Sequence, residues 1–326
     1  MNCLHPSAKP LGRACAVTLS LSALLCPQGP VLAESGASSE VRYTYQTIEL
    51  PQGASQADAS YSLNDEGEIA GYYFDEDSLA HSYLWQRGTL VPLNAPNQLW
   101  TNARKINNRG QVVGTYGDAY GSYFGFLWDT EKGTWTQLMD PPGITEANAV
   151  TGINNHGVIL GSAVGGAFPN WVGWTLSHGS YSFFTVPGFA GGPTDVTTTG
   201  INDEGTISGY YFERSIPSEG VHGFVREHGK ITRLNVPGAD QTVPTGINND
   251  GDVVGNYTLP GPAPKKLYGF VLHKEKYVTV NYPGTDGDTW LAGINNRGQL
   301  LGNEGGATDP SGHGTVFIAT PSRKGH

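Results

Sequence analysis

Cysteine is scarce in this sequence, which has three among 326 residues, and all three fall near the start: Cys3, Cys15 and Cys26. Beyond Cys26 the chain therefore has no thiol nucleophile, no thiolate metal ligand and no means of forming a disulfide. A chain of this length buries a substantial core and does not depend on disulfides to fold.

Long apolar runs are also missing. The apolar stretch at residues 14–26, which follows Lys9 and Arg13, is shorter than the roughly 20 residues that span a bilayer. With Val31-Leu32-Ala33 as a cleavage site, we expect residues 1–33 to be a secretory signal peptide that leads to the periplasm or the cell exterior. A lipoprotein acylated at Cys26 ranks second, since Leu25 fits that signal poorly. Residues 34–41 are typical of a flexible lead-in.

Positive charge is in short supply, with 19 Lys and Arg against 29 Asp and Glu, for a formal net charge of −10. Removal of residues 1–33 takes away Lys9 and Arg13 and leaves −12. An acidic surface argues against nucleic acid and against anionic membranes as partners.

Known catalytic and cofactor motifs are absent from the sequence. It has no Walker loop, Rossmann glycine pattern, His-Glu-x-x-His or Gly-x-Ser-x-Gly. The nine histidines are scattered without metal-ligand spacing. His81 and His222 occupy equivalent strand ends and are interpreted as structural rather than as lining a shared cavity. We expect no metal, no cofactor and no identifiable catalytic residue.

A short phrase recurs six times: an aliphatic residue, Asn, Asp or Asn, any residue, Gly, any residue, an aliphatic residue and, soon after, Gly. Its first Asn lies at successive intervals of 43, 47, 48, 46 and 47 residues, at Asn64, Asn107, Asn154, Asn202, Asn248 and Asn295. Repeats of this length predict an array or closed ring of similar units.

Each phrase is typical of a β-hairpin turn, in which Asn and Asx bond the turn backbone and Gly takes the positive φ. We interpret all 12 Asx positions as turn devices. A calcium site is disfavoured because other copies place Arg109, His156 or Arg297 where Glu66 or Asp250 stands. The glycine that follows each turn, from Gly71 to Gly302, predicts close approach within the strand.

A third strand in each unit is centred on one aromatic residue, which is expected to pack between neighbouring sheets. These residues are Tyr83, Phe126, Trp174, Phe224, Phe270 and Phe317. A tight turn, such as Gln86-Arg87-Gly88-Thr89, then leads to a fourth strand, and a longer link reaches the next phrase.

The two ends of the chain indicate how the array closes. The last unit, residues 293–320, has three strands, and the missing fourth matches residues 45–51, which resemble residues 277–283. The sequence therefore predicts an all-β fold, a six-bladed β-propeller at residues 42–320 with an N-terminal strand closing the last blade, followed by a tail at 321–326. A β-solenoid or two stacked half-arrays is the alternative.

The Asn-Asx-x-Gly phrases, together with triplets such as His81-Ser82-Tyr83 and His222-Gly223-Phe224, resemble the bacterial extracellular repeat proteins called the HAF family, named for a His-Ala-Phe triplet. The resemblance covers residues 42–320. Only two copies of the triplet keep the His. The resemblance implies an exported bacterial protein and brings no catalytic residues with it.

A ligand is expected at the face where crossovers and variable loops emerge, since loops on a rigid scaffold concentrate binding residues. The three tryptophans of this face suit stacking on a sugar or aromatic ligand; their alternative role is to seal the channel mouth or pack between blades. The candidate residues are Asp58, Trp100, Asn102, Glu146, Asn148, Trp171, Asp195, Thr242, Asp288 and Trp290.

These features favour an exported, monomeric, non-catalytic binding protein with an extracellular glycan or protein ligand. The rival hypothesis is a secreted carbohydrate-active hydrolase or lyase, with Asp58, Glu146, Asp195 and Asp288 around a central funnel. A purely structural envelope protein is the third possibility.

Overall fold

The computed structural model describes residues 41–48, 61–75, 77, 79–96, 98–117, 123–188, 192–213, 220–285, 288–304 and 315–322. These residues belong to one compact unit, Val41–His326. The expected signal peptide at 1–33, most of the lead-in and most of the tail lie outside the described residues. None of the described residues belongs to a helix long and apolar enough to cross a membrane.

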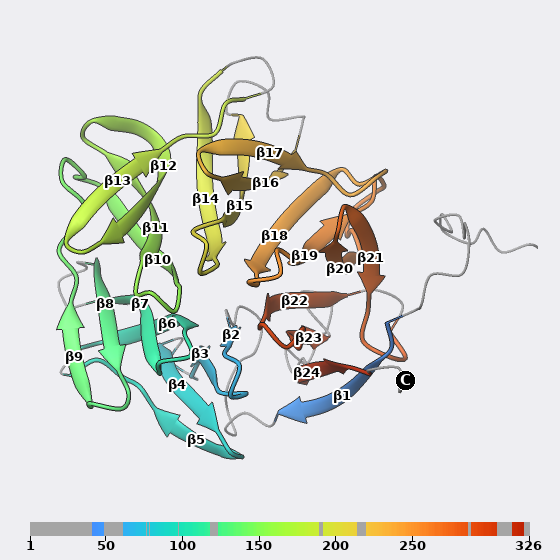
Figure 1. Ribbon diagram of the computed structural model, residues 1–326, viewed down its shortest axis with the longest axis horizontal. Helices are drawn as coiled ribbons and strands as arrows, with labels where there is room; N and C mark the ends of the chain where they lie inside the picture. The colour runs from blue at the N-terminus through green and yellow to red at the C-terminus, as the bar shows by residue number, and fades with distance from the viewer. Residues whose placement is uncertain are drawn as a thin grey trace, which may run out of the picture. The chain divides into compact units, whose positions relative to one another are not determined.

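Strands β1 to β24 form six antiparallel sheets of four strands each within this described part of the chain. The sheets surround a common centre, so the predicted six-bladed β-propeller is confirmed (Figure 1). Blade 1 comprises β2 (Tyr61–Leu63), β3 (Ile69–Phe74), β4 (Ala80–Gln86) and β5 (Thr89–Pro92); blade 2 comprises β6 (Trp100–Ile106), β7 (Gln111–Gly117), β8 (Tyr123–Asp129) and β9 (Thr134–Gln137); blade 3 comprises β10 (Ala147–Ile153), β11 (Ile159–Gly165), β12 (Phe168–Ser177) and β13 (Ser180–Phe184). Blade 4 comprises β14 (Thr194–Ile201), β15 (Ile207–Glu213), β16 (His222–Glu227) and β17 (Lys230–Leu234); blade 5 comprises β18 (Gln241–Ile247), β19 (Val253–Thr258), β20 (Leu267–His273) and β21 (Lys276–Val280); blade 6 comprises β22 (Thr289–Ile294), β23 (Leu300–Glu304), β24 (Thr315–Pro321) and β1 (Tyr43–Ile48).

The first strand completes the last blade, as the repeat count predicts. Strand β1 pairs with β24 along its whole length, from Tyr43 opposite Pro321 to Ile48 opposite Val316. The Tyr45 ring packs edge-on against Phe317 with centroids 5.4 Å apart, and its hydroxyl donates to the Asn281 carbonyl at 3.1 Å. Pairing of the two chain ends closes the ring and covers the edge of β24.

The phrase glycines of blades 2 to 6 let an aromatic ring lie over the second strand of the blade. Gly161 on β11 pairs with Trp174 on β12, and a Cβ at Gly161 would lie 2.1 Å from Trp174 Cζ2 and 2.4 Å from the Ala149 carbonyl oxygen. Only glycine leaves room for this approach, as expected. The six central aromatics are almost fully buried, which confirms their role in the core.

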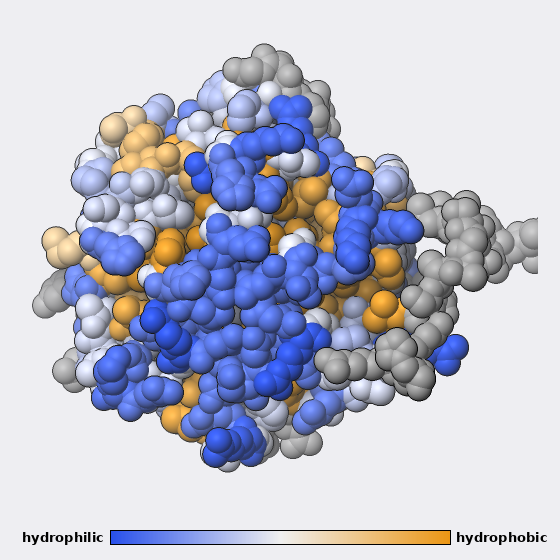
Figure 2. Space-filling view, viewed as in Figure 1, coloured by the Kyte–Doolittle hydropathy of each residue, from blue (hydrophilic) through white to orange (hydrophobic). Residues whose placement is uncertain are grey.

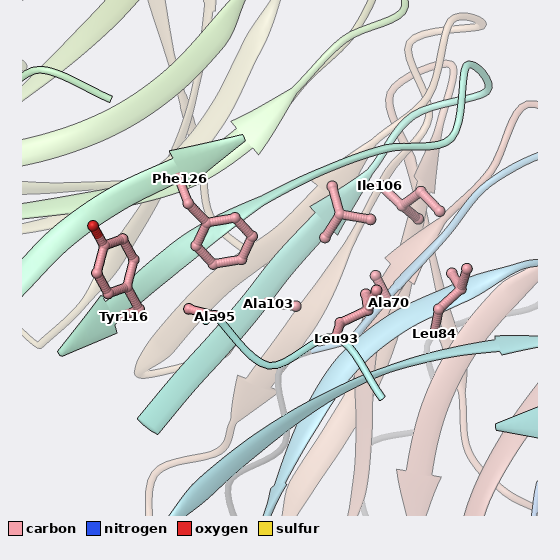
Figure 3. Close-up of a cluster of buried hydrophobic side chains, with 9 residues drawn as sticks. Ala70, Leu84, Leu93, Ala95, Ala103, Ile106, Tyr116 and Phe126 are labelled. Atoms are coloured by element: carbon pink, nitrogen blue, oxygen red, sulfur yellow. The ribbon is translucent and has the colours of Figure 1, made fainter. Parts of the chain in front are cut away.

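The core is divided into six clusters, each between two neighbouring blades. In the cluster between blades 1 and 2, Leu84 and Leu93 face Ala103 and Phe126 (Figure 3). Every blade has an apolar face on both sides, so a single blade cannot bury its own apolar side chains. Closure of the ring stabilises the fold because it gives every apolar face a neighbouring blade to pack against.

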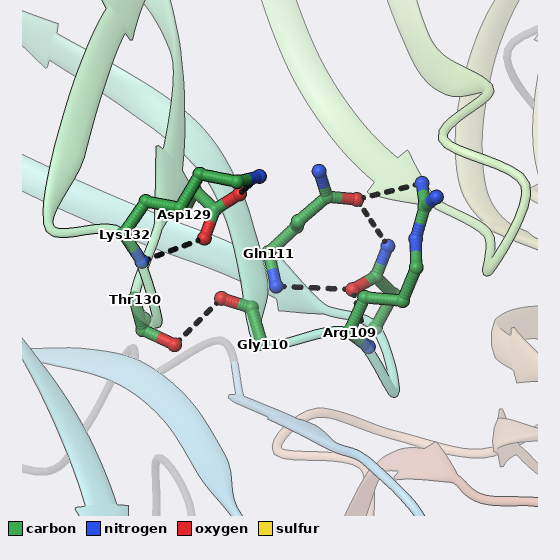
Figure 4. Close-up of polar contacts among 7 residues, drawn as sticks. Arg109, Gly110, Gln111, Asp129, Thr130 and Lys132 are labelled. Carbon is green, nitrogen blue, oxygen red and sulfur yellow. Dashed lines mark hydrogen bonds and ion pairs between the residues drawn. The ribbon is translucent and has the colours of Figure 1, made fainter.

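The turn phrases adopt the predicted hairpin geometry. In blade 2, Asn107 Oδ1 accepts hydrogen bonds from the backbone N–H groups of Arg109 and Gln111, both at 3.0 Å, and Gly110 takes a φ of +65°. The Arg109 guanidinium also donates to Gln111 Oε1 (Figure 4). These bonds satisfy the backbone of the turn.

The same asparagines also join neighbouring blades, a role that the turn interpretation missed. The Nδ2 group of each phrase Asn donates to the main-chain oxygen of the corresponding Asn in the next blade, at 3.0 to 3.4 Å. The last of these bonds runs from Asn295 back to Asn64 at 3.0 Å, so the six bonds form a closed circle.

A second circle is formed by the Asx residues that follow. Each backbone N–H in this position donates to the Asx Oδ1 of the next blade, at 2.7 to 2.9 Å. Asp203 Oδ2 accepts further bonds from the amides of Asn155 and Asn249, and Asp65 Oδ2 from those of Asn108 and Asn296. The interpretation of these positions as turn devices alone was therefore wrong. The sequence of a turn indicates the hydrogen bonds within that turn, but it does not indicate which residues of the next blade lie beside it.

Candidate functional site

A belt of side chains around the central axis comes from irregularities in the inner strands. Each inner strand of blades 2 to 6 shifts register by one residue three positions before the phrase Asn, which is the pattern of a β-bulge. A bulge leaves one residue unpaired and re-aims its side chain. These unpaired residues all line one central cavity: Arg104, Thr151, Thr199, Thr245 and Ala292.

Blade 2 departs from the other blades at this belt. Three blades carry Thr-Gly before the Ile-Asn of the phrase, blade 6 carries Ala292-Gly293 and blade 1 carries Tyr61-Ser62 before Leu-Asn. Blade 2 has Arg104-Lys105 in the same two positions. The single basic pair of the belt therefore comes from one strand, β6.

Lys105 crosses the axis of the ring. Its Nζ donates to the Thr245 carbonyl oxygen at 3.1 Å, on the inner strand of blade 5, the blade opposite blade 2. Part of the Lys105 side chain is exposed to the channel, and protein surrounds the channel at this level. This burial, with a smaller contribution from the Arg104 charge, lowers the pKa of Lys105 from 10.5 to about 8.

Two cavities lie along the axis, and Lys105 contributes to the walls of both. The first, of about 80 Å³, lies among the phrase residues, including Asp65 and Asp203. The second, of about 200 Å³, is lined by residues from earlier in the inner strands, including Arg104, Tyr210 and Trp290. Since inner strands run from the crossovers to the phrases, the second cavity is the one nearer the crossover and loop end.

Arg104 brings an unsatisfied donor to this cavity. Its Nε atom is buried and makes no hydrogen bond within the described part of the chain. No carboxylate is present among the described residues that line the cavity. Two adjacent cations without a counter-ion are a feature of binding and catalytic sites rather than of stable cores.

Trp290 is the sequence-predicted residue that lines this cavity, and it also packs against the cluster between blades 6 and 1. Asn102 lies two residues before Arg104 on β6. Its position in blade 2 is equivalent to that of Trp290 in blade 6, since each lies five residues before the phrase Asn. Its Oδ1 atom is buried without a hydrogen-bond partner among the described residues. Trp100 lies farther along the strand, with its ring 5.4 Å from that of Tyr123.

The predicted carboxylates serve the scaffold and are not part of the cavity wall. Buried Asp195 accepts a hydrogen bond from the Trp171 N–H at 2.9 Å, and Asp288 Oδ1 accepts one from Leu267 N–H at 3.4 Å. Glu146 lies beside Gly165, where a Cβ would meet its side chain. Asp58 lies outside the described residues.

The remaining predicted residues also make structural contacts. Asn148 accepts from the Trp174 indole N–H at 3.0 Å, and the buried Thr242 hydroxyl accepts from the Val236 N–H at 3.0 Å. His81 contacts Asp75 at 2.6 Å, and His222 contacts Asn235 at 3.2 Å, in separate blades. Within the described residues, no three His, Cys, Asp or Glu side chains gather in a way that holds a metal ion.

Sequence reasoning missed Arg104 and Lys105, although a signal was present. When the repeats are aligned on the phrase Asn, Arg104-Lys105 stands where three other repeats have Thr-Gly. Replacement of two small uncharged residues by two long cations in one repeat indicates that this repeat has a function of its own. The axial direction of the two side chains, however, depends on the bulge in β6.

The propeller is also the fold of known structures that this chain resembles. A protein of unknown function from Dyadobacter fermentans aligns with a TM-score of 0.55 and 11% identity over 87% of this chain and 100% of that one. Pyrococcus horikoshii acylaminoacyl peptidase aligns with a TM-score of 0.52 and 16% identity, over 82% of this chain and 44% of the peptidase. The β-propeller domain of the trilobed protease from Pyrococcus furiosus, which has an open velcro topology, aligns with a TM-score of 0.50 and 14% identity over 82% of this chain and 83% of that one.

At these identities the likeness establishes the fold alone. No family model matches the sequence, and neither does any curated protein. Any function of this chain must therefore be inferred from the residues of its site.

Proposed function

We propose that this protein is an exported binding protein that captures its ligand in the central channel, at the crossover end of the propeller. The observation that carries the proposal is the cavity of about 200 Å³ between the inner strands, lined by two cations, several threonines, Tyr210 and Trp290. Polar groups that converge beside an aromatic ring in a preformed cavity are characteristic of small-ligand sites.

One of the ten residues predicted to bind ligand contributes to the cavity wall. Trp290 belongs both to the predicted set and to the cavity wall. The rival hydrolase hypothesis needs paired carboxylates in the funnel, and Glu146, Asp195 and Asp288 lie elsewhere. No specific observation favours hydrolysis, so binding without turnover is the proposed activity.

Export and the HAF resemblance form part of the same proposal. The N-terminal signal pattern supports export, and the Asn-Asx-x-Gly phrases support membership of the HAF family. Expression in a bacterial host, followed by fractionation and N-terminal sequencing, tests export directly. A chain that stays in the cytoplasm with residues 1–33 intact contradicts it.

Binding is tested on an array of glycans and small metabolites, followed by incubation of each hit with the protein. The expected result is at least one hit that is recovered unchanged. Conversion of the hit to a product overturns the non-catalytic assignment. An array without any hit overturns the binding proposal itself.

A further inference from the structure

We propose that the channel cavity binds a carboxylate-bearing monosaccharide, such as a uronic acid, with the carboxylate held by Arg104 and Lys105 and the sugar ring beside Trp290. This inference rests on the proposed binding function and names its ligand class. It follows from the charge, the lining and the size of the cavity.

The charge of the cavity requires an anion. Arg104 and Lys105 are neighbours in sequence, both reach the cavity, and the wall contributes no described carboxylate. The acidic side chains Asp65 and Asp203 line the other cavity and already accept amide hydrogen bonds from two asparagines each. A bound anion would neutralise the repulsion between the two cations.

The geometry of the basic pair favours a planar carboxylate. A guanidinium presents parallel N–H donors that match the two oxygens of a carboxylate, while an ammonium adds a point charge beside them. Arg104 Nε is buried and lacks a partner within the described chain, so at least one of these donors is available. A buried donor without an acceptor costs free energy that a ligand oxygen would recover.

The rest of the lining matches the body of a sugar. Thr151, Thr199 and Thr245 line the cavity, and their hydroxyls are bonded within the scaffold, to Thr198 Oγ1 at 2.6 Å, to Ser208 Oγ at 3.3 Å and to the Leu291 carbonyl at 2.7 Å. A hydroxyl that donates within the scaffold keeps oxygen lone pairs that can accept from a sugar O–H group. Trp290 supplies an aromatic surface against which the apolar face of a sugar ring packs. The cavity of about 200 Å³ lies below the roughly 300 Å³ at the lower end for drug-sized ligands, which suits a single sugar.

The repeat itself supplies the test variant. Arg104→Thr with Lys105→Gly restores the Thr-Gly of blades 3, 4 and 5, so the double variant is expected to fold. Arg109→Thr is the matched control, because it removes an exposed cation from the same blade at the turn. Trp290→Val places in blade 6 the residue that Val243 supplies at the equivalent position of blade 5.

Isothermal titration of the full-length protein with D-glucuronate, D-galacturonate, D-glucose, acetate and inorganic phosphate tests the proposal. We expect a uronate to bind more tightly than glucose, acetate or phosphate. The double variant is expected to bind it roughly 10- to 100-fold more weakly, as for loss of a charged hydrogen bond. Arg109→Thr should bind like the wild type, and Trp290→Val should lose the ligand-induced change in tryptophan fluorescence.

Equal uronate affinity in the wild type and the double variant overturns the proposal. So does phosphate or acetate that binds as well as the uronates, because the sugar ring would then contribute nothing. If neither uronate binds while the array yields another ligand, this inference fails and the proposed function stands. If the array is blank as well, both fail.

Discussion

The side-chain amide of Asn295, in the last repeat, donates a hydrogen bond to the main-chain oxygen of Asn64, in the first repeat, at 3.0 Å. The propeller is thus closed at two places, by this bond near the axis and by the pairing of β1 with β24 at the outer edge. Polar side chains also cover the centre of one face of the ring (Figure 2).

Replacement of Asn295 tests the bond between the two ends of the array. Asn295→Asp keeps the oxygen that accepts from the N–H groups of Arg297 and Gln299 but cannot donate to Asn64. We expect both Asn295→Asp and Asn295→Ala to lower the free energy of unfolding by about 1–3 kcal/mol, because the buried Asn64 carbonyl loses one of its two donors and keeps only the Gly67 N–H. Urea unfolding measures the effect, with exposed Arg297→Ala as control; wild-type stability of Asn295→Asp contradicts the role of the bond.

Gly161→Ala tests the close approach within blade 3. The new Cβ would lie 2.1 Å from Trp174 Cζ2, and Trp174 is fully buried. We expect a loss of about 1–3 kcal/mol in the free energy of unfolding from overpacking. Gly261→Ala is the control, since nothing lies within 4 Å of a Cβ there. Equal thermal midpoints for the two variants would show that the core accommodates the methyl group.

Asp203 makes the Asx circle sensitive to acid. Burial would raise the pKa of Asp203, but hydrogen bonds from the amides of Asn155 and Asn249 more than offset it, and the pKa lies below its usual value. A carboxyl with a lowered folded-state pKa stabilises the fold above its unfolded pKa of about 3.9, and this contribution disappears as the pH falls through the folded value.

Asp203→Asn should therefore be less stable than the wild type at pH 7, by about 1–3 kcal/mol, because the amide nitrogen that replaces Oδ2 cannot accept from the amides of Asn155 and Asn249. The difference should stay constant down to about pH 5 and shrink below about pH 4. Urea titrations across this range provide the measurement. A difference that is the same in acid and at neutral pH would rule out Asp203 as the acid-sensitive group.

Lys105 should destabilise the fold while it is charged. With its pKa lowered to about 8 in the folded state, the unfolded chain binds more protons between about pH 8 and 10.5, so stability rises across that window. As the pH rises from about 8 to 10.5, the free energy of unfolding of the wild type should increase by up to about 3 kcal/mol relative to that of Lys105→Gly. This value is an upper limit because water in the channel screens the charge.

The comparison isolates Lys105 because the variant keeps the other titratable and charged groups that line the two cavities, Arg104, Tyr210, Asp65 and Asp203. Guanidinium unfolding of both proteins at several pH values is the measurement. Parallel pH dependences of the two proteins would contradict the lowered pKa.

The fold was predictable from the sequence because its signals are local. The phrase residues, such as Asn107 and Gly110, specify a hairpin turn within five positions, and the match of residues 45–51 to 277–283 identifies the strand that closes the ring. The bonding of Asn107 to Asn154 was not predictable, because a turn signal does not say what lies beside the turn.

Of the residues expected from the sequence to bind ligand, Trp290 lines the cavity, and its binding role stays a prediction. Trp290 was found because an aromatic residue near the start of an inner strand is expected at a channel mouth. Asp195 and Glu146 were chosen as polar crossover residues, but small shifts in where each strand begins direct such side chains into the scaffold. Arg104 and Lys105 were not chosen, since neither a bulge nor its direction is visible in one repeat.

The sequence by itself determined the number of blades, the order of strands within them and the way the chain ends meet, because turn chemistry and residue alternation act over a few positions and repeat six times. Only the tertiary structure decided which side chains meet at the axis. Lys105 and Thr245 are 140 residues apart in the sequence. They are in contact because the six blades close into a ring, in which the inner strands of blades 2 and 5 face each other and the Lys105 side chain spans the channel between them.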